Sequence, residues 1–305
     1  MTLLIEQTLN GIQLGLLMFL LAAGLTLVFG IMDFVNLAHG SLYMFGAYFC
    51  ASFSAWTDSF VLGALLALPA TLLLGIAVEV VVVRRLYRRD HLDHVLATFG
   101  LILIANDLVR LAWGPDGRRI PLPAWLNQPI HLTPELPYPT YRFAVIVVGA
   151  AVALFLYWLV SHTRTGMWIR AGASNRTMIG ALGINIEALF TLVFGLGAVL
   201  AGLAGLMAAP IVTVSIGMGD NILILALVVI VIGGIGSIKG AFIAAMVVGM
   251  IDTLGRALLP DLLKSFLSVA AANTAAPAIS SMLIYLLMAA VLALRPQGLF
   301  PVKHG

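Results

Sequence analysis

Long apolar stretches dominate the chain, and short polar segments separate them. This pattern predicts nine membrane-spanning helices, at about residues 9–32, 40–56, 60–83, 95–113, 142–160, 187–208, 221–236, 240–258 and 278–294. Such runs approach or reach the roughly 20 residues with which a helix crosses the hydrocarbon core of a bilayer. Their apolar residues are continuous, whereas the strands of a membrane β-barrel alternate apolar and polar residues. We therefore predict an all-α polytopic membrane protein with eight or nine transmembrane helices, some of them interrupted.

Composition supports the same fold class. Of the 305 residues, 62% are hydrophobic and 10% are charged, whereas an ordinary soluble domain is about one quarter charged. The mean hydropathy is +1.09. These values exclude a water-soluble protein, and we expect a single transmembrane domain that covers residues 1–305.

Three basic segments lie between or after the apolar runs, at residues 84–94, 161–176 and 295–305. Because Lys and Arg accumulate in short cytoplasmic loops of membrane proteins, we expect all three on the cytoplasmic side. The count of spans then places the N-terminus outside and the C-terminus in the cytoplasm. The loop at about 114–141 falls outside in this scheme. This loop carries Arg118 and Arg119, but long loops follow the charge rule less strictly than short ones. Because it is also rich in proline, we expect it to form a structured external cap.

A first polar break interrupts the apolar pattern within LTLVFGIMDFVNLAHGSLYMFGA, residues 25–47. It places Asp33, Asn36, His39 and Ser41 in a hydrophobic region, where ionisable groups are costly and usually face a bundle interior or water. Two interpretations are open. Asp33 or Asn36 can cap a helix end without touching any ligand. Alternatively, the cluster lines or gates a pathway, which is the interpretation that we favour for the cluster as a whole.

A second break, GGIGSIKG at residues 233–240, interrupts another apolar run, so that residues 25–49 and 223–249 share one pattern. Paired interrupted segments are typical of transporters built from repeats, with the pathway near the breaks. Chance similarity between glycine-rich segments is the alternative. The second break is not a phosphate-binding loop, because Lys239 does not follow a glycine and does not precede Ser or Thr.

The remaining polar residues do not form an enzyme site. The sequence contains no zinc, nucleotide-binding or nucleophile motif. The HLDH segment at residues 91–94 lacks the further ligands that a metal site needs, which favours a solvated loop. Glu79 and Asp107 lie near the ends of predicted spans, where we expect them to reach interfacial water or to pair with Arg84 and Arg110.

Two segments carry features that point to packing and docking. The run FGLGAVLAGLAGL places glycines at a spacing that lets another helix approach closely. In the basic segment AGASNRTMIGALGIN, Ser174 can cap a short helix, Met178, Ile179 and Leu182 then fall on one face, and Gly183 can end it. Such a face suits the groove of a partner protein. It equally suits the membrane interface, and the residues alone leave both interpretations open.

Four separated segments carry a family resemblance. They are GLTLVFGIMDFVNLAHGSLYMFGAY, ASNRTMIGALGINIEALFTLVFGLGAVLAGLAGLM, VIGGIGSIKGAFIAAMVVGMID and RPQGLF. Together, and in this order, they closely resemble the LivH-type permease subunit of branched-chain amino-acid ABC importers. The resemblance implies the permease fold of an ABC importer in a bacterial inner membrane and ATP-driven import of branched-chain or related amino acids.

The same resemblance implies partners. They are a second, LivM-like permease, two cytoplasmic ATPase subunits and a periplasmic solute-binding protein. ATP would be used by the ATPase subunits, so this chain would hold no cofactor and would not itself be an enzyme. The short helix within the cytoplasmic segment at about 161–186 would couple the chain to the ATPase. The candidate coupling residues are Ser174, Asn175, Met178, Ile179, Leu182 and Gly183.

Transport by alternating access would then open a path past the two breaks. The candidate pathway residues are Asp33, Asn36, His39, Ser41, Gly233, Gly234 and Gly236. One alternative is an ATP-independent channel or proton-coupled carrier, for which Asp33 and Asp252 are the coupling groups available. Others are an ABC permease for urea, short amides, or aromatic or other carboxylates, and a scaffold subunit that conducts nothing.

Overall fold

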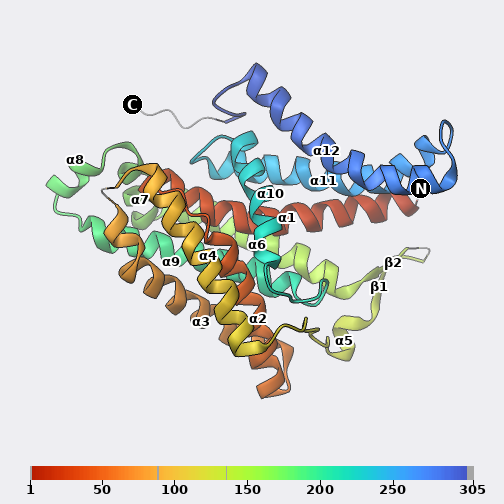
Figure 1. Ribbon diagram of the computed structural model, residues 1–305, viewed down its shortest axis with the longest axis horizontal. Coiled ribbons are helices and arrows are strands. Elements are labelled where there is room, and N and C mark those ends of the chain that lie inside the picture. Colours follow the sequence, from red (N-terminus) through yellow and green to blue (C-terminus); the bar gives the residue numbers. More distant parts are fainter. Residues whose placement is uncertain (1, 88, 135, 301–305) are drawn as a thin grey trace.

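The computed structural model of the chain describes residues 2–87, 89–134 and 136–300 and is built almost entirely from helices (Figure 1). Within these residues, seven helices are long and apolar enough to cross a membrane, the second of them including a 3-10 helix, η1. They are α1 (Thr2–Met32), α3 (Phe60–Val81) with η1 (Val83–Leu86), α4 (His91–Trp113), α6 (Thr140–His162), α9 (Ile186–Ala208), α11 (Ile238–Leu263) and α12 (Val269–Leu294).

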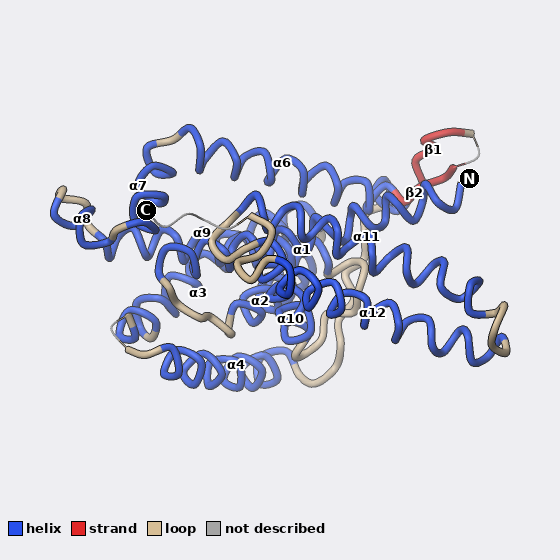
Figure 2. Tube along the Cα trace, turned by 90° about the horizontal axis from the view of Figure 1, so that it is seen from above, coloured by secondary structure: helices blue, strands red, loops and turns tan. Residues whose placement is uncertain are grey.

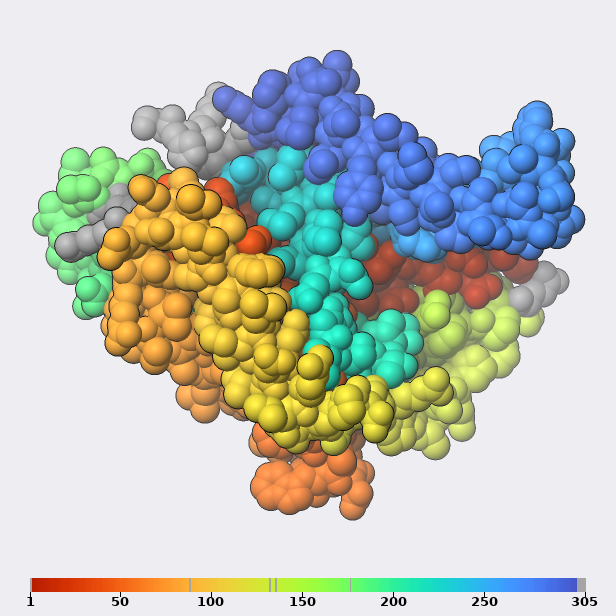
Figure 3. Space-filling view, in the orientation of Figure 1, coloured from red at the N-terminus to blue at the C-terminus, as the bar shows by residue number. Residues whose placement is uncertain are grey.

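Two further helices, α2 (His39–Thr57) and α10 (Met218–Gly233), correspond to the other two predicted spans. With 16 residues, α10 is too short to cross a bilayer core alone, and α2 is less apolar than the seven longer helices. Neighbouring helices cover them in part: α2 packs against α3 and α9, and α10 packs against α1, α2 and α11. On the face drawn in Figure 3, α10 is visible between α4 and α12.

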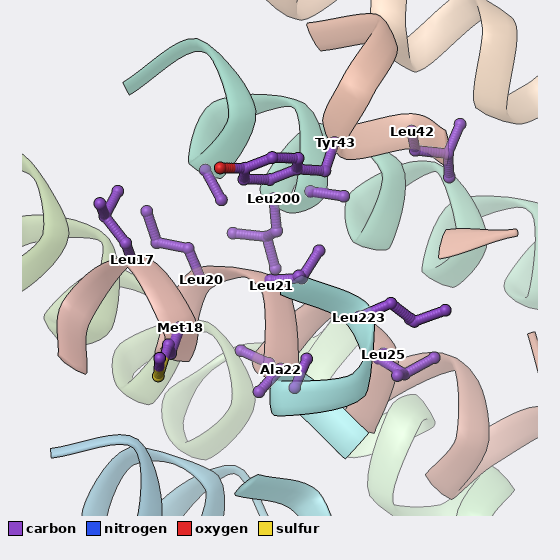
Figure 4. Packing of buried hydrophobic residues seen from close by; sticks show 14 of the residues in the cluster. Leu17, Met18, Leu20, Leu21, Ala22, Leu25, Leu42, Tyr43, Leu200 and Leu223 are labelled. Atoms are coloured by element: carbon purple, nitrogen blue, oxygen red, sulfur yellow. The ribbon is translucent and has the colours of Figure 1, made fainter. Parts of the chain in front are cut away.

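The core of the bundle forms around α1. This helix packs against α11, α9, α6 and α10, and 83% of its most apolar window is buried, compared with 17% for α4, α6 and α12. A helix that is apolar on all sides must be covered by protein or by lipid. Neighbouring helices cover α1, and Figure 4 shows Leu17, Leu20 and Leu21 of α1 near Tyr43 of α2 and Leu200 of α9. The outer surfaces of α4, α6 and α12 remain for lipid or partners.

Glycines bring α9 into close contact with α1 and α2, as the run of small residues in α9 predicts. A Cβ atom on Gly46 would collide with the backbone of Gly202, and one on Gly205 would collide with the backbone of α2. A Cβ atom on Gly197 would lie 3.1 Å from the carbonyl oxygen of Gly24 in α1. These three helices therefore pack backbone to backbone in the conformation that the structure describes.

Two long helices each end at an irregular segment that leads into a shorter interior helix. Residues 33–38 join α1 to α2, and residues 209–217 join α9 to α10. Because α1 and α9 begin at opposite ends of the molecule (Figures 1 and 2), the two units run in opposite directions. The interior helices begin side by side, since Cβ atoms on Gly40 and Gly219 would each collide with the other residue's backbone. The predicted repeat paired the first break with residues 233–240. In the structure, the counterpart of the first break is instead the segment 209–217.

The remaining elements lie at the two ends of the molecule. The short helix α5 (Ala124–Asn127) and the antiparallel strands β1 (Pro129–Thr133) and β2 (Leu136–Pro139) lie toward the end where α1 begins (Figures 1 and 2). The helices α7 (Arg164–Ser174) and α8 (Arg176–Ala181) lie at the opposite end. The proline-rich loop is therefore structured, as expected, but its two-stranded hairpin departs from the all-helical prediction.

Candidate functional site

The first break begins at Asp33, directly after the last residue of α1. Its backbone φ is +50°, in the left-handed region that few residues other than glycine adopt. The carboxylate is 57% exposed and lies 4.0 Å from Nε2 of His91 at the start of α4. Asp33 therefore turns the chain at the surface of the bundle, apart from the buried members of the predicted cluster.

The other three members, Asn36, His39 and Ser41, lie inside the bundle with exposed fractions of 2%, 0% and 5%. The side-chain polar atoms of all three make no hydrogen bond to the described residues, and neither do the buried hydroxyls of Thr26 and Tyr48. Leaving a buried polar group unpaired costs about 1–3 kcal/mol, and native proteins have only a few such groups per hundred residues. The interior around the start of α2 therefore has unused hydrogen-bonding capacity.

Two glycines hold the imidazole of His39 within this cluster. A Cβ atom on Gly24 of α1 would lie 2.9 Å from Nε2, and one on Gly197 of α9 would lie 3.5 Å from Cε1. The backbone of Leu21 faces the ring, but neither ring nitrogen meets hydrogen-bond geometry. The close approach of α1 and α9 thus fixes the depth of a polar side chain inside an apolar bundle.

Capping does not account for the first break. The residue before α2 is Ala38, which has no side-chain hydrogen bond to the helix. Asn36 contributes its backbone carbonyl to the turn, as acceptor for the His39 amide at 3.4 Å, while its side chain stays unpaired. Of the two interpretations of the sequence, the geometry favours a polar cluster with another role.

The second break joins α10 to α11 through Gly234 and Gly236, whose φ angles are +102° and +82°. A Cβ atom on Gly30 would lie 2.9 Å from Cα of Gly236, so this turn contacts α1 close to its end. Gly233 packs against Gly240, where a Cβ atom would collide with backbone. These glycines permit tight turns and close packing, and Gly236 alone reaches the neighbourhood of the first break.

The segment after α12 covers the end of α10. The amide of Leu299 donates to the carbonyl of Ile232 at 2.9 Å, and that of Phe300 donates to the carbonyl of Gly233 at 3.0 Å. A Cβ atom on Gly234 would lie 2.9 Å from the Phe300 carbonyl oxygen. Gly233 and Gly234 are therefore packed against backbone rather than against the polar cluster of the first break.

The candidate coupling segment folds as α7 followed by α8. Ser174 is the last residue of α7, so the prediction that it caps the following helix is wrong. Asn175 is the cap: its side-chain oxygen accepts a hydrogen bond from the amide of Met178 at 2.9 Å. Asn and Ser cap helices equally well, and the sequence pattern could not distinguish these two neighbours.

The end of α8 is as predicted. Gly183 has φ +86°, its amide donates to the carbonyl of Gly180 at 3.1 Å, and the amide of Ile184 donates to that of Ile179 at 3.3 Å. These two bonds form the Schellman arrangement that commonly ends a helix at glycine.

The three apolar residues of this segment, Met178 and Ile179 in α8 and Leu182 directly after it, do not share one face, which corrects the prediction. Met178 and Leu182 are 58% and 73% exposed, whereas Ile179 is 3% exposed. Ile179 anchors the helix to the bundle, because a buried residue of this size contributes about 1.5–3 kcal/mol of burial energy. Met178 and Leu182 lie four residues apart and form a small apolar surface that this chain leaves uncovered.

Glu79 belongs to a buried network that we call the Glu79 network: Glu79, Arg84, Tyr87 and Thr191. The sequence predicted the Glu79–Arg84 pair but not the other two partners. The Glu79 carboxylate is fully buried and accepts bonds from Nε and Nη2 of Arg84 at 3.2 and 3.1 Å and from the Thr191 hydroxyl at 2.9 Å. The Tyr87 hydroxyl also donates to it, and burial raises the pKa of Tyr87, which keeps this donor protonated. The predicted Glu79–Arg84 pair is thus confirmed. Thr191 lies 112 residues away, and no spacing could have indicated it.

The histidines of HLDH are engaged separately. His91 faces Asp33, and Nε2 of His94 lies 2.9 Å from the carbonyl oxygen of Leu86. Across the described part of the chain, no three His, Cys, Asp or Glu side chains are grouped in a way that could hold a metal ion.

Comparison with known proteins places the chain in a family. Residues 7–292 match the family described as branched-chain amino acid transport system / permease component. The permease protein BraD of the high-affinity branched-chain amino acid transport system of Pseudomonas aeruginosa is 30% identical over 82% of this chain and 86% of its own. The corresponding LivH of Salmonella typhimurium is 29% identical over 87% and 90%, and a probable LivH of Methanocaldococcus jannaschii is 25% identical over 78% and 76%. No solved structure matches the chain significantly. This multi-pass membrane protein therefore belongs to the family of permease components of branched-chain amino acid transport systems.

Proposed function

We propose that this chain is the membrane permease subunit of an ATP-driven importer in the bacterial inner membrane, and that the importer carries branched-chain or related amino acids. The family match over most of the chain supports the permease function. The names of the relatives, which are permeases of branched-chain amino acid transport systems, support the class of solute.

The polar cluster of Asn36, His39 and Ser41 is the observation that carries a transport mechanism. These side chains sit at the start of an interrupted helix, buried and without partners among the described residues. Irregular backbone at membrane depth is tolerated where it borders a cavity or is covered by protein. In the mechanism we propose, movement of α2 relative to α1 and α9 exposes this cluster to the passing solute, alternately from the two sides.

We further propose how the partners are arranged. The exposed Met178 of α8 and Leu182, directly after it, dock on a cytoplasmic ATPase subunit. Two such subunits hydrolyse ATP, so this chain itself needs no cofactor. A second permease completes the channel, and a periplasmic binding protein delivers solute at the end where α1 begins. In this orientation the N-terminus lies outside and the basic segments, with α7 and α8, lie in the cytoplasm.

A proton-coupled carrier is the rival from another class, and two observations weigh against it. Such a carrier needs a titratable group deep in the membrane. Asp33 is 57% exposed beside His91, and Asp252 is tied to Arg256 at 2.8 Å. Neither of the carboxylates that the sequence offers for this role is a free buried acid.

Gentle affinity purification of the chain from its native membrane tests the proposal. We expect a second permease and nucleotide-binding subunits to remain bound, and the reconstituted assembly to take up radiolabelled leucine only with ATP and the binding protein. Recovery of the chain alone, with uptake in liposomes that needs no ATP, would overturn the proposal in favour of a channel or carrier. ATP-dependent uptake of urea or an aromatic acid in place of leucine would keep the importer and replace the solute.

A further inference from the structure

A pocket with a volume of about 410 Å³ opens between α1, α6 and α11, at the end of the molecule where α1 begins. We call it the α1–α11 pocket. Its polar lining comes from three helices and its apolar lining includes the segment that precedes α10. The residues that matter are Asn10, Gln13, Arg142, Ile211, Asp252 and Arg256.

Arg142 supplies the pocket with a positive charge that has no ion-pair partner among the described residues. Its Nη1 donates to the side-chain oxygen of Asn10 at 2.7 Å, and the hydroxyl of Tyr138 donates to the same oxygen at 3.1 Å. Among the described residues, no carboxylate lies within ion-pair distance of Arg142. A guanidinium has five N–H donors. Asn10 accepts from one of the Arg142 nitrogens and orients the group, so most of the donors remain available to a ligand.

The other charges of the pocket neutralise each other. Nε of Arg256 donates to both oxygens of Asp252, at 2.9 and 3.0 Å, and Nη2 donates to Ser281 at 3.2 Å. Two arginines and one aspartate leave the lining with a net charge of +1. A pocket with this charge favours a ligand that brings one negative group.

A second pocket at the opposite end shows that the free arginine is a specific feature. It lies between α3 and α9, which pack together as α11 and α1 do. There, Arg84 also meets the lining, but Glu79 lies 3.1 Å from it and Glu187 lies 3.8 Å from it. Arg84 thus has two carboxylate partners, whereas Arg142 of the α1–α11 pocket has none among the described residues.

The rest of the α1–α11 pocket suits a small apolar group. Leu14, Ile211 and Ala257 line it beside the polar residues. Gln13 is 6% exposed, lines the pocket and makes no side-chain hydrogen bond to a described residue, so its amide is available as donor and acceptor. A branched aliphatic body with one carboxylate matches this combination.

We propose that the α1–α11 pocket binds the carboxylate group of the transported solute through Arg142, with the solute's apolar body against Leu14 and Ile211. The inference rests on the proposed importer function and narrows its solute to carboxylates with small apolar bodies. Two sources share this chemistry: an amino acid, whose ammonium group would meet Gln13 or Asp252, and a simple carboxylate without an ammonium group.

Saturation-transfer NMR on the full transporter complex in lipid nanodiscs, without the binding protein, tests the site directly. The probes are L-leucine, 4-methylpentanoate and L-leucinamide. We expect saturation transfer to leucine and 4-methylpentanoate but not to leucinamide, which lacks the carboxylate. Transfer to leucine alone would assign the site to amino acids. Equal transfer to leucine and leucinamide would overturn the proposal.

Variants connect the signal to Arg142. Because a hydrogen-bonded charge contributes about 1.5–3 kcal/mol, Arg142→Gln should weaken leucine binding roughly tenfold or more, and Arg142→Lys should restore part of it. Arg119→Gln removes the same charge from an exposed position outside the pocket and should change nothing. Equal leucine binding by Arg142→Gln and the unmodified chain would overturn the proposal.

ATP-driven uptake by the same complex, with its binding protein, separates the two proposals. We expect Arg142→Gln to raise the KM for leucine while ATP dependence persists. ATP-driven uptake with an unchanged KM would reject the pocket and keep the importer. Absence of ATP-driven uptake in the unmodified complex, with carboxylate binding still dependent on Arg142, would reject the importer and keep the site.

Discussion

His39 and Asn36 are buried at a cost that the described fold does not offset. Their polar atoms have no hydrogen-bond partner, and Gly24 and Gly197 leave room for the imidazole ring between two closely packed helices. An apolar side chain of similar size would avoid the penalty of about 1–3 kcal/mol for an unpaired buried group. These polar groups therefore lower the stability of the bundle, and contact with a polar solute would explain why they are present.

Replacing each residue with leucine tests whether these polar groups serve transport at the expense of stability. We expect Asn36→Leu and His39→Leu to lower ATP-dependent leucine uptake in proteoliposomes at least roughly tenfold, since one lost hydrogen bond to the passing solute corresponds to about that factor. Thermal unfolding in detergent should show unchanged or higher stability. Thr98→Val is a suitable control, because this buried hydroxyl bonds its own helix, at 2.7 Å from the His94 carbonyl. Full uptake by the leucine variants would contradict a role in the pathway.

The Glu79 network is a second residue-scale feature with a measurable energy. Removing one partner of a buried ion pair costs about 3–5 kcal/mol, because the remaining charge stays buried. Arg84 is one-third exposed, so we expect Arg84→Ala to lower the free energy of unfolding by about 3 kcal/mol, the low end of that range. Unfolding by titration with SDS in mixed micelles measures this loss of free energy. Arg110→Ala, at an exposed pair with Asp107, should cost no more than about 1 kcal/mol, and equal losses would count against the network.

At the scale of elements, each of the nine predicted spans corresponds to a helix. Seven of these helices, within the described residues, are long and apolar enough to cross a membrane, and α2 and α10 are not. The hydrophobic pattern also located both breaks. It could not show that residues 209–217 form the counterpart of the first break, since MAAPIVTVSIGMGD is apolar enough to resemble an ordinary loop or span end. Nor could it indicate the β hairpin, whose strands are short and proline-rich, with Pro129 opposite Pro139.

The candidate site was predictable in part for a related reason. Asn36, His39 and Ser41 stand out from an apolar run, whereas Thr26 and Tyr48, which are buried and unpaired like them, are unremarkable residues within helices. In α8, helical spacing groups residues by angle but does not reveal which side the bundle covers, and tertiary packing put Ile179 on the covered side.

This difference within α8 gives a sharp test of docking. Met178→Ser with Leu182→Ser changes only exposed side chains, so the chain should fold and insert normally. It should bind the ATPase subunits roughly thirtyfold more weakly if each side chain contributes about 1 kcal/mol, and should therefore retain less of them on purification. Ile179→Ser removes a buried anchor, and it should lower thermal stability as well. If the double variant keeps its ATPase subunits at full stoichiometry, α8 rests at the membrane interface instead.

At the scale of the whole molecule, two oppositely directed units share one contact. The helices α2 and α10 begin side by side at Gly40 and Gly219, each at the end of an irregular segment, and they are reached from opposite ends of the bundle. A displacement of either interior helix therefore changes the packing of both units. An arrangement of this kind can expose the interior first to one side and then to the other, which alternating access requires.

ATP can drive such a cycle only if the molecule is inserted with α7 and α8 facing the compartment that contains ATP. Thiol labelling determines this orientation. Cys50 is fully buried, so the unmodified chain should react little with a membrane-impermeant maleimide. Gln128→Cys, before α6, and Ser161→Cys, in the last turn of α6, are neutral changes at exposed positions. They leave the Lys and Arg distribution that sets topology intact. In intact spheroplasts we expect labelling at position 128 only, with position 161 becoming reactive after lysis. The reverse pattern would put α8 outside, where no ATPase could dock, and both the orientation and the coupling role of this segment would have to be abandoned.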